Sequence, residues 1–145
     1  MAISAKIYGL FLKSLANKEI NLNTDSIKVM LCTSAYVPNQ DTHQYKSSIT
    51  NEITGTGYTA GGVALGSVVT TYTAASNTLM LDAADAIWAT ATFTARYAVI
   101  YDATPATDAT RPLISYVDFG ADVQATAAEF KLSWDALGIV SISAS

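Results

Sequence analysis

His43 is the only histidine in the chain and is therefore the first residue to consider as a catalytic base. A hydrolytic triad needs a nucleophile, a base and an orienting acid close together. Asp41 lies two residues from His43 in a polar stretch, but the sequence contains no GxSxG nucleophile-elbow motif. We therefore predict a solvated loop histidine, no catalytic residue and no enzymatic activity.

The residue types that bind metals are few and scattered. Zinc sites use several Cys, His or carboxylate ligands, and Cys32 and His43 alone do not make such a set. Aspartates could supply a structural Ca²⁺ site, but no D-x-[DN]-x-[DN]-G loop is present. We expect those at strand ends to accept hydrogen bonds from nearby backbone N–H groups instead, so we predict no metal and no cofactor. The six aspartates considered are Asp82, Asp85, Asp102, Asp108, Asp118 and Asp122.

Cys32 is the only cysteine, so the chain cannot form an internal disulfide. It ends the apolar run from Ile27, which predicts a small buried hydrophobic side chain. The alternative is a reactive thiol.

The run GTGYTAGG, residues 55–62, fits only a relaxed GxGxxA version of the dinucleotide-binding motif. A helix must follow that motif to bind the pyrophosphate, whereas residues 63–72 have the pattern of a strand. We expect the glycines to permit a turn or close backbone packing.

Glycoside hydrolysis would need paired carboxylates, and the chain has only three glutamates, Glu19, Glu52 and Glu129. Aromatic side chains could form a sugar-binding platform, and Tyr58, Trp88 and His43 gathered in one cleft would support it. Tyr97, Tyr101 and Trp134 instead occupy alternating strand positions, where aromatic residues usually form core and cross-strand contacts.

Length, charge and apolar stretches limit which classes of protein this chain can belong to. The 145 residues predict one domain, residues 1–145, with enough chain for a hydrophobic core. Only 14% of residues are charged and the net charge is −4, so we expect no nucleic-acid partner. The apolar stretch from Ile7 ends at Lys13, too short for a signal peptide, and no window is long enough to span a membrane. We expect synthesis in a cytoplasm and no membrane partner.

One helix is expected near the N-terminus, at about residues 4–17. Ile7, Leu10, Phe11 and Leu15 recur at helical spacing, and Ser4 could cap the start. This apolar stripe either covers part of the core or forms a docking surface for a partner.

The rest of the chain alternates in hydrophobicity and predicts seven or so short strands. Turn signals separate them, and a polar stretch from Ser34 to about Glu52 has no predicted element. The fold class is therefore mainly β, a single-domain antiparallel β-sandwich or barrel. The expected strands are residues 27–32, 63–72, 79–82, 87–93, 97–101, 113–119, 130–134 and 139–142.

Several long strings together span nearly the whole chain: AKIYGLFLKSL with NKEI, DSIKVMLCTSAYVPNQDTHQY, TGTGYTAGG, RYAVIYDATPATDATRPLISYVDFG and the closing W-D-A-x-G-I. These strings resemble a family of small tailed-bacteriophage virion structural proteins. The resemblance implies a virion protein assembled in the host bacterial cytoplasm, without catalytic residues to carry over.

The first prediction of function is a capsid decoration or cement protein that stabilises the head. Its partners would be other virion proteins, above all the major capsid protein, in a homotrimer or another symmetric assembly. The helix stripe and the Ser34–Glu52 stretch are the expected contact surfaces. The alternatives are a neck, tail or fibre component and, from another class, a carbohydrate-binding module or small hydrolase.

Overall fold

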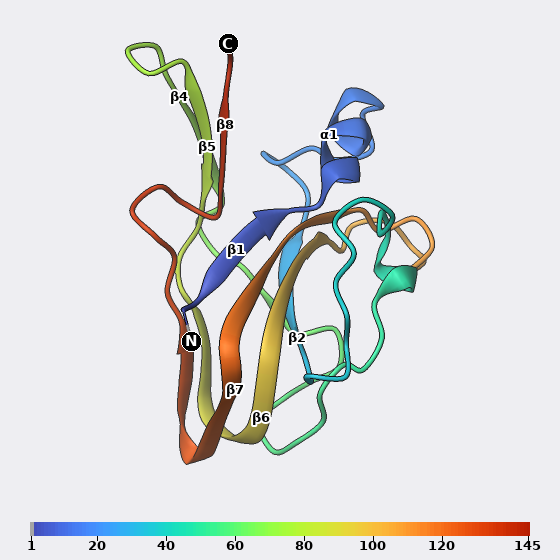
Figure 1. Ribbon diagram of the computed structural model, residues 1–145, viewed down its shortest axis with the longest axis vertical. Coiled ribbons are helices and arrows are strands. Elements are labelled where there is room, and N and C mark those ends of the chain that lie inside the picture. The colour runs from blue at the N-terminus through green and yellow to red at the C-terminus, as the bar shows by residue number, and fades with distance from the viewer. Residues whose placement is uncertain (1) are drawn as a thin grey trace.

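The computed structural model describes residues 2–145 and has two antiparallel β-sheets and one α-helix (Figure 1). The larger sheet has the order β1-β7-β6-β2-β3 and the smaller one β4-β5-β8. This confirms the predicted mainly β, sandwich-like class, and the sheets do not close into a barrel. The elements are β1 (Ser4–Ile7), α1 (Gly9–Ala16), β2 (Ile27–Cys32), the 3₁₀ helix η1 (Lys46–Ser48), β3 (Val63–Ala64), β4 (Val69–Thr73), β5 (Thr78–Asp82), β6 (Ala86–Asp102), β7 (Leu113–Leu132) and β8 (Val140–Ser143).

Two long strands, β6 and β7, form the centre of the fold. The sequence predicts four separate strands here, residues 87–93, 97–101, 113–119 and 130–134. This prediction is wrong, because the first two segments belong to the continuous strand β6 and the last two, up to Leu132, to β7. Between the pairs Ala95–Val123 and Tyr97–Asp118, β7 has three more residues than β6. Such a bulge bends a strand without ending it. In Figure 1 both strands turn back together at the bottom of the view, so one hairpin contributes to two layers.

The larger sheet is buried on both faces around β2 and the adjoining parts of β6 and β7, whereas residues 86–95 of β6 and 121–132 of β7 include many exposed positions. Residues 27, 29 and 31 of β2 contribute to the main core, which also holds aromatic residues of β6 and β7. Met30 and Cys32 face the other way, into a second cluster built largely of tyrosines. Four side chains of the main core lie with ring centroids 5.2–6.3 Å apart, as expected for packed aromatic residues: Trp88, Phe93, Phe119 and Phe130.

The N-terminal segment differs from its prediction. Ser4 does not cap a helix but starts β1, which pairs antiparallel with β7 from Ser4–Asp118 to Ile7–Ser115. The helix begins at Gly9, after Tyr8, whose side chain makes no capping hydrogen bond. Tyr8 is completely buried, so it fixes the chain between strand and helix, and the helix is eight residues long rather than about fourteen.

The stretch from Ser34 to Glu52 has a structural task that its sequence does not reveal. It covers the second face of the larger sheet, where Tyr36 is buried and Ile49 packs against the tyrosine cluster. Isolated bridges join Cys32 to Glu52 and Tyr45 to Pro112. The length of this stretch is therefore partly explained by core coverage.

Two predicted strands have irregular register. Residues 63–72 contain β3 and β4, which belong to different sheets, and Ser67 between them has a left-handed φ of 52°. In β7, the simple alternation expected over residues 113–119 is wrong at Ile114. Tyr101 pairs with Leu113 and Ile100 with Ser115, so Ile114 is an extra residue that shifts the following side chains to the opposite face.

Candidate functional site

A chain of hydrogen bonds links Tyr8, Tyr36 and His43 on the second face of the larger sheet. The hydroxyls of Tyr8 and Tyr36 are 2.8 Å apart, and the Tyr36 hydroxyl is 2.9 Å from Nδ1 of His43. The backbone N–H of Asn39 also points at this nitrogen, at 3.4 Å. Nδ1 is therefore the acceptor in a neutral imidazole, which leaves Tyr36 as its donor and Tyr8 as the donor to Tyr36.

Burial governs the protonation of these hydrogen-bonded side chains. It raises the pKa of Tyr36 to about 12 and lowers the pKa of His43 below its ordinary value. The expectation of a solvated histidine is thus wrong, because the ring is half-buried and hydrogen-bonded. All three groups are neutral near pH 7, and their hydrogen bonds fasten the 34–52 stretch to the start of α1.

A polar pocket of about 470 Å³ lies at the end of the same face, where six segments meet. Lys28 comes from β2, Lys46 from η1, Gly61 from the glycine run and Tyr101 from the end of β6. The other two segments are the loop of residues 103–112 and the end of the 34–52 stretch, which contributes Glu52. Backbone hydrogen bonds from Lys46 to the Arg111 carbonyl and from Ser47 to the Asp108 carbonyl fix η1 against this loop.

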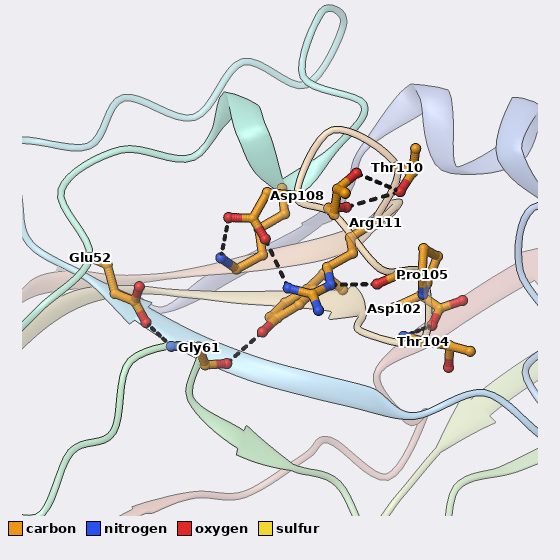
Figure 2. A network of polar contacts seen from close by, with 11 residues as sticks. Glu52, Gly61, Asp102, Thr104, Pro105, Asp108, Thr110 and Arg111 are labelled. Carbon is orange, nitrogen blue, oxygen red and sulfur yellow. Dashed lines mark hydrogen bonds and ion pairs between the residues drawn. The ribbon is translucent and has the colours of Figure 1, made fainter.

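Asp108 joins two of the cations that line this pocket. Its carboxylate accepts from Lys46 Nζ at 3.0 Å and from Arg111 Nη1 at 2.9 Å. These contacts, led by the Lys46 hydrogen bond, lower the pKa of Asp108 below its ordinary value. Arg111 also donates through Nε to the Pro105 carbonyl at 2.8 Å, which fixes the guanidinium plane (Figure 2).

Glu52 connects the pocket to the main core. Its Oε1 accepts from the Tyr58 hydroxyl at 2.7 Å and from the Gly61 N–H at 2.6 Å. The Tyr101 hydroxyl donates to the Gly61 carbonyl at 2.6 Å, so both backbone groups of this glycine are held (Figure 2). Tyr58 in turn stacks on Trp88, with ring centroids 6.3 Å apart.

Asp102 is buried at the start of the neighbouring loop. Its Oδ1 accepts from the Thr104 N–H at 2.9 Å, while Oδ2 has no hydrogen-bond partner in the part of the chain that the structure describes. Burial, with the nearby carboxyl of Asp25, raises the pKa of Asp102 to about 6. A carboxyl group here is protonated more readily than in water.

An apolar groove of about 890 Å³ runs beside the free edge of β1. The end of β7 and the segment that leads into β8 form the other wall, with Trp134 in it. Ile3 and Leu137 line the groove and keep 68% and 69% of their surface exposed. The groove therefore combines unpaired strand backbone with exposed apolar side chains.

Several predicted residues behave as expected. Cys32 is free and buried, and burial raises the pKa of its thiol to about 12, which contradicts the reactive-thiol alternative. Asp82, Asp102 and Asp118 each accept a hydrogen bond from a backbone N–H one or two residues later. Asp118 also forms an ion pair with Arg96 at 2.7 Å.

The three residues whose clustering would support sugar binding do not share a cleft. Tyr58 and Trp88 stack within the main core, and Trp88 is buried. His43 packs instead against the tyrosine cluster on the other face of the sheet. Tyr97 and Tyr101 also contribute to that cluster, as their alternation predicts.

The glycine run permits close backbone packing, as expected. A Cβ atom at Gly57 would collide with the Thr90 carbonyl of β6, and one at Gly62 with the Val29 carbonyl of β2. Both residues have left-handed φ, 83° and 79°. The run therefore lies directly against two strands and delivers Gly61 to the polar pocket.

The polar pocket is the site that sequence reasoning missed. The spacing of Asp108 and Arg111 is a local signal for an ion pair. Lys28 and Lys46 lie far from them in sequence, so only the fold reveals their convergence. Within residues 2–145 no three His, Cys, Asp or Glu side chains are grouped to hold a metal ion, and no helix is long and apolar enough to cross a membrane.

Comparisons with known proteins give no match: no family model, no curated protein and no solved structure is similar to this chain. The resemblance to phage virion proteins stays a prediction.

Proposed function

We propose that the chain is a non-enzymatic structural protein of a tailed-bacteriophage virion. Its role is that of a capsid decoration protein, which binds the outside of the head and stabilises the coat lattice. The partner is the major capsid protein, and the site of action is the virion. The proposal rests on the resemblance of the sequence and is supported by one feature of the surface, the apolar groove beside β1.

The groove supports assembly because its wall has unmet hydrogen-bonding capacity. Within residues 2–145, β1 pairs with β7 alone. Of its outward backbone groups, the Ile7 carbonyl accepts from Gln40 Nε2 at 2.8 Å, and those nearer Ser4 are left for another strand. An extended segment of a coat subunit can add to this edge while its apolar side chains cover Ile3 and Leu137. Pairing through main-chain hydrogen bonds does not depend on charged side chains. It therefore suits a chain in which only 14% of residues are charged.

Repetition makes a weak contact sufficient. A single short strand addition buries less surface than a stable pairwise interface needs. On a capsid the same contact recurs at each equivalent position, and an oligomer of the decoration protein would engage several subunits at once. Many modest contacts then reinforce the head.

The test compares phage particles that carry the intact chain, lack it, or carry a groove variant. Leu137→Lys puts a charge into the groove, and Val69→Lys changes an exposed residue on β4 as the matched control. We expect only Leu137→Lys and the deletion to abolish attachment and to lower the temperature at which heads release DNA.

Three results would refute parts of this proposal. Particles without any copies of the chain would refute a virion role. Copies confined to the neck, tail or fibres would replace the decoration role with the alternative one. Equal attachment of the Leu137→Lys and Val69→Lys variants would exclude the groove as the contact surface.

A further inference from the structure

The polar pocket has a property that the virion role does not use. Its three cationic side chains, Lys28, Lys46 and Arg111, come from three segments far apart in sequence. The chain as a whole has a net charge of −4, so this is a local concentration of positive charge on an acidic protein. Its volume of about 470 Å³ lies in the range of ligand pockets, about 300–1,000 Å³.

Two of the cations are held in place before any ligand arrives. Lys46 keeps only 13% of its side-chain surface exposed and is paired with Asp108, and Arg111 is fixed by Asp108 and the Pro105 carbonyl. Figure 2 shows Asp108, Arg111 and Gly61 converging on this space. Binding here therefore costs little side-chain ordering.

Lys28 differs because its charge is unmatched. It is half-buried on β2, opposite Tyr101 in the sheet register, and lines the pocket. Within residues 2–145 it forms neither an ion pair nor a side-chain hydrogen bond, whereas Lys46 is paired. The ammonium of Lys28 is therefore available to pair with an added anion in the pocket.

The charges in the pocket select the class of anion. Three cations face two carboxylates, and of these Asp108 is paired while Glu52 is engaged by Tyr58 and Gly61 through one oxygen. The surplus is thus one positive charge. A monoanion neutralises this surplus, whereas a dianion would leave one uncompensated negative charge beside the two carboxylates.

We propose that this pocket binds one carboxylate group, which pairs with the Lys28 ammonium and lies beside Arg111. Ser26, Tyr101 and two alanines also line the pocket, whose volume leaves room for the group that bears the carboxylate. The carboxylate belongs either to an acidic sugar or to an Asp or Glu side chain of a protein. This proposal does not depend on a virion role, and its test uses the purified chain alone.

The experiment titrates the chain with defined probes and follows backbone amide chemical shifts by NMR. Glucuronate represents an acidic sugar and N-acetyl-glutamate N-methylamide an acidic side chain, while methyl glucoside and, at about pH 8, inorganic phosphate are the neutral and dianionic controls. We expect saturable shifts centred on Lys28, Gly61 and Arg111 with both carboxylates. The tighter of the two identifies the source.

Variants separate the pocket from general electrostatics. Lys28→Gln should weaken carboxylate binding at least about tenfold, Lys28→Arg should retain it, and Lys13→Gln, on the exposed side of α1, should leave it unchanged. Thermal unfolding of each variant verifies that it is folded. Because the Arg variant retains charge at the same position, a loss seen with Gln but not Arg is assigned to the charge.

Four results would overturn the proposal: no saturation with either carboxylate, equal binding of methyl glucoside, tighter binding of phosphate, or unchanged affinity in folded Lys28→Gln. Failure here would leave the virion role intact, because attachment to particles is measured separately.

Discussion

Tyr36 lies between two groups of different exposure, the completely buried Tyr8 and the half-buried His43. The Tyr36 hydroxyl accepts a hydrogen bond from the Tyr8 hydroxyl and donates one to Nδ1 of His43. Within residues 2–145 it is the only hydrogen-bond partner of the buried Tyr8 hydroxyl. A buried hydroxyl left without a partner costs about 1–3 kcal/mol. Tyr36 is therefore a stabilising residue even though it belongs to a loop.

Tyr36→Phe should lower the free energy of unfolding by about 1–3 kcal/mol, because the Tyr8 hydroxyl then remains buried without a partner. The double variant Tyr8→Phe, Tyr36→Phe removes that hydroxyl as well and should be more stable than the single Tyr36→Phe variant. Urea unfolding of the parent and the two variants measures both differences. A double variant that is less stable than the single one would contradict this explanation.

Asp102 should make the protein less stable as the solution becomes less acidic. Because its pKa is raised to about 6 in the folded chain, the folded state holds this proton more tightly than the unfolded state does. The contribution to stability is present below pH 4 and is lost as the pH rises through about 6. Asp102→Asn keeps an acceptor for Thr104 and should be more stable than the parent at pH 8, by about 1–2 kcal/mol.

Thermal and urea unfolding of the parent and the Asp102→Asn variant between pH 4 and pH 8 provides the measurement. The difference between the two curves isolates Asp102, because both proteins contain His43 and its contribution cancels. That contribution has the opposite sign: the lowered pKa of His43 means that stability is lost as the pH falls below about 6.5. Asp122→Asn, on an exposed part of β7, is the control and should show no such difference. A variant equal to the parent at pH 8 would refute the burial argument.

At the scale of elements, the glycine run decides how closely the 55–62 segment approaches the sheet. Gly62 has a left-handed φ of 79°, and a Cβ there would collide with the Val29 carbonyl. Gly66 offers a contrast, because no atom of residues 2–145, apart from its own neighbours in the chain, lies within 4 Å of an added Cβ. Gly62 combines a left-handed backbone with a clash and Gly66 has neither, so the pair compares a position that requires glycine with one that does not.

Gly62→Ala should lower the free energy of unfolding by at least about 2 kcal/mol, since it combines a left-handed backbone with a clash against β2. Gly66→Ala should change it by less than about 1 kcal/mol. Chemical denaturation compares the two variants directly. Similar unfolding energies for both would mean that the run is not packed as described.

The sequence predicts elements well where one rule governs a segment. The alternation of residues 130–134 reproduces the exposure pattern there, with Phe130 and Leu132 buried and Lys131 exposed. It fails where local patterns compete: Ile7 fits both a helical stripe and β1, and pairing with β7 decides in favour of the strand. Bulges at Ile114 and before Val123 depend on the partner strand, so a single segment does not reveal them.

At the scale of the whole molecule, the candidate sites arise from convergence that the sequence does not encode locally. The pocket joins residues as far apart as Lys28 and Arg111, and the groove joins Ile3 to Leu137. Composition predicts a chain with few residues suited to catalysis, and the absence of enzymatic activity stays a prediction. The low charge is distributed over an open sandwich that has free edges at β1, β3, β4 and β8.

Free strand edges are sites for pairing with another chain, and natural proteins usually block them when no partner is intended. Here β1 carries a single charged residue, Lys6, and borders the apolar groove. The proposed role as a decoration protein supplies a partner for this edge.

The most direct test of that role is a cryo-electron-microscopy map of the intact phage particle, with the copy number of the chain measured by quantitative mass spectrometry. We expect copies at every equivalent position on the outer surface of the head, in fixed proportion to the major capsid protein, with the β1 edge and the groove facing the coat. A head surface without density for the chain, in particles that contain no copies of it, would contradict the proposed function.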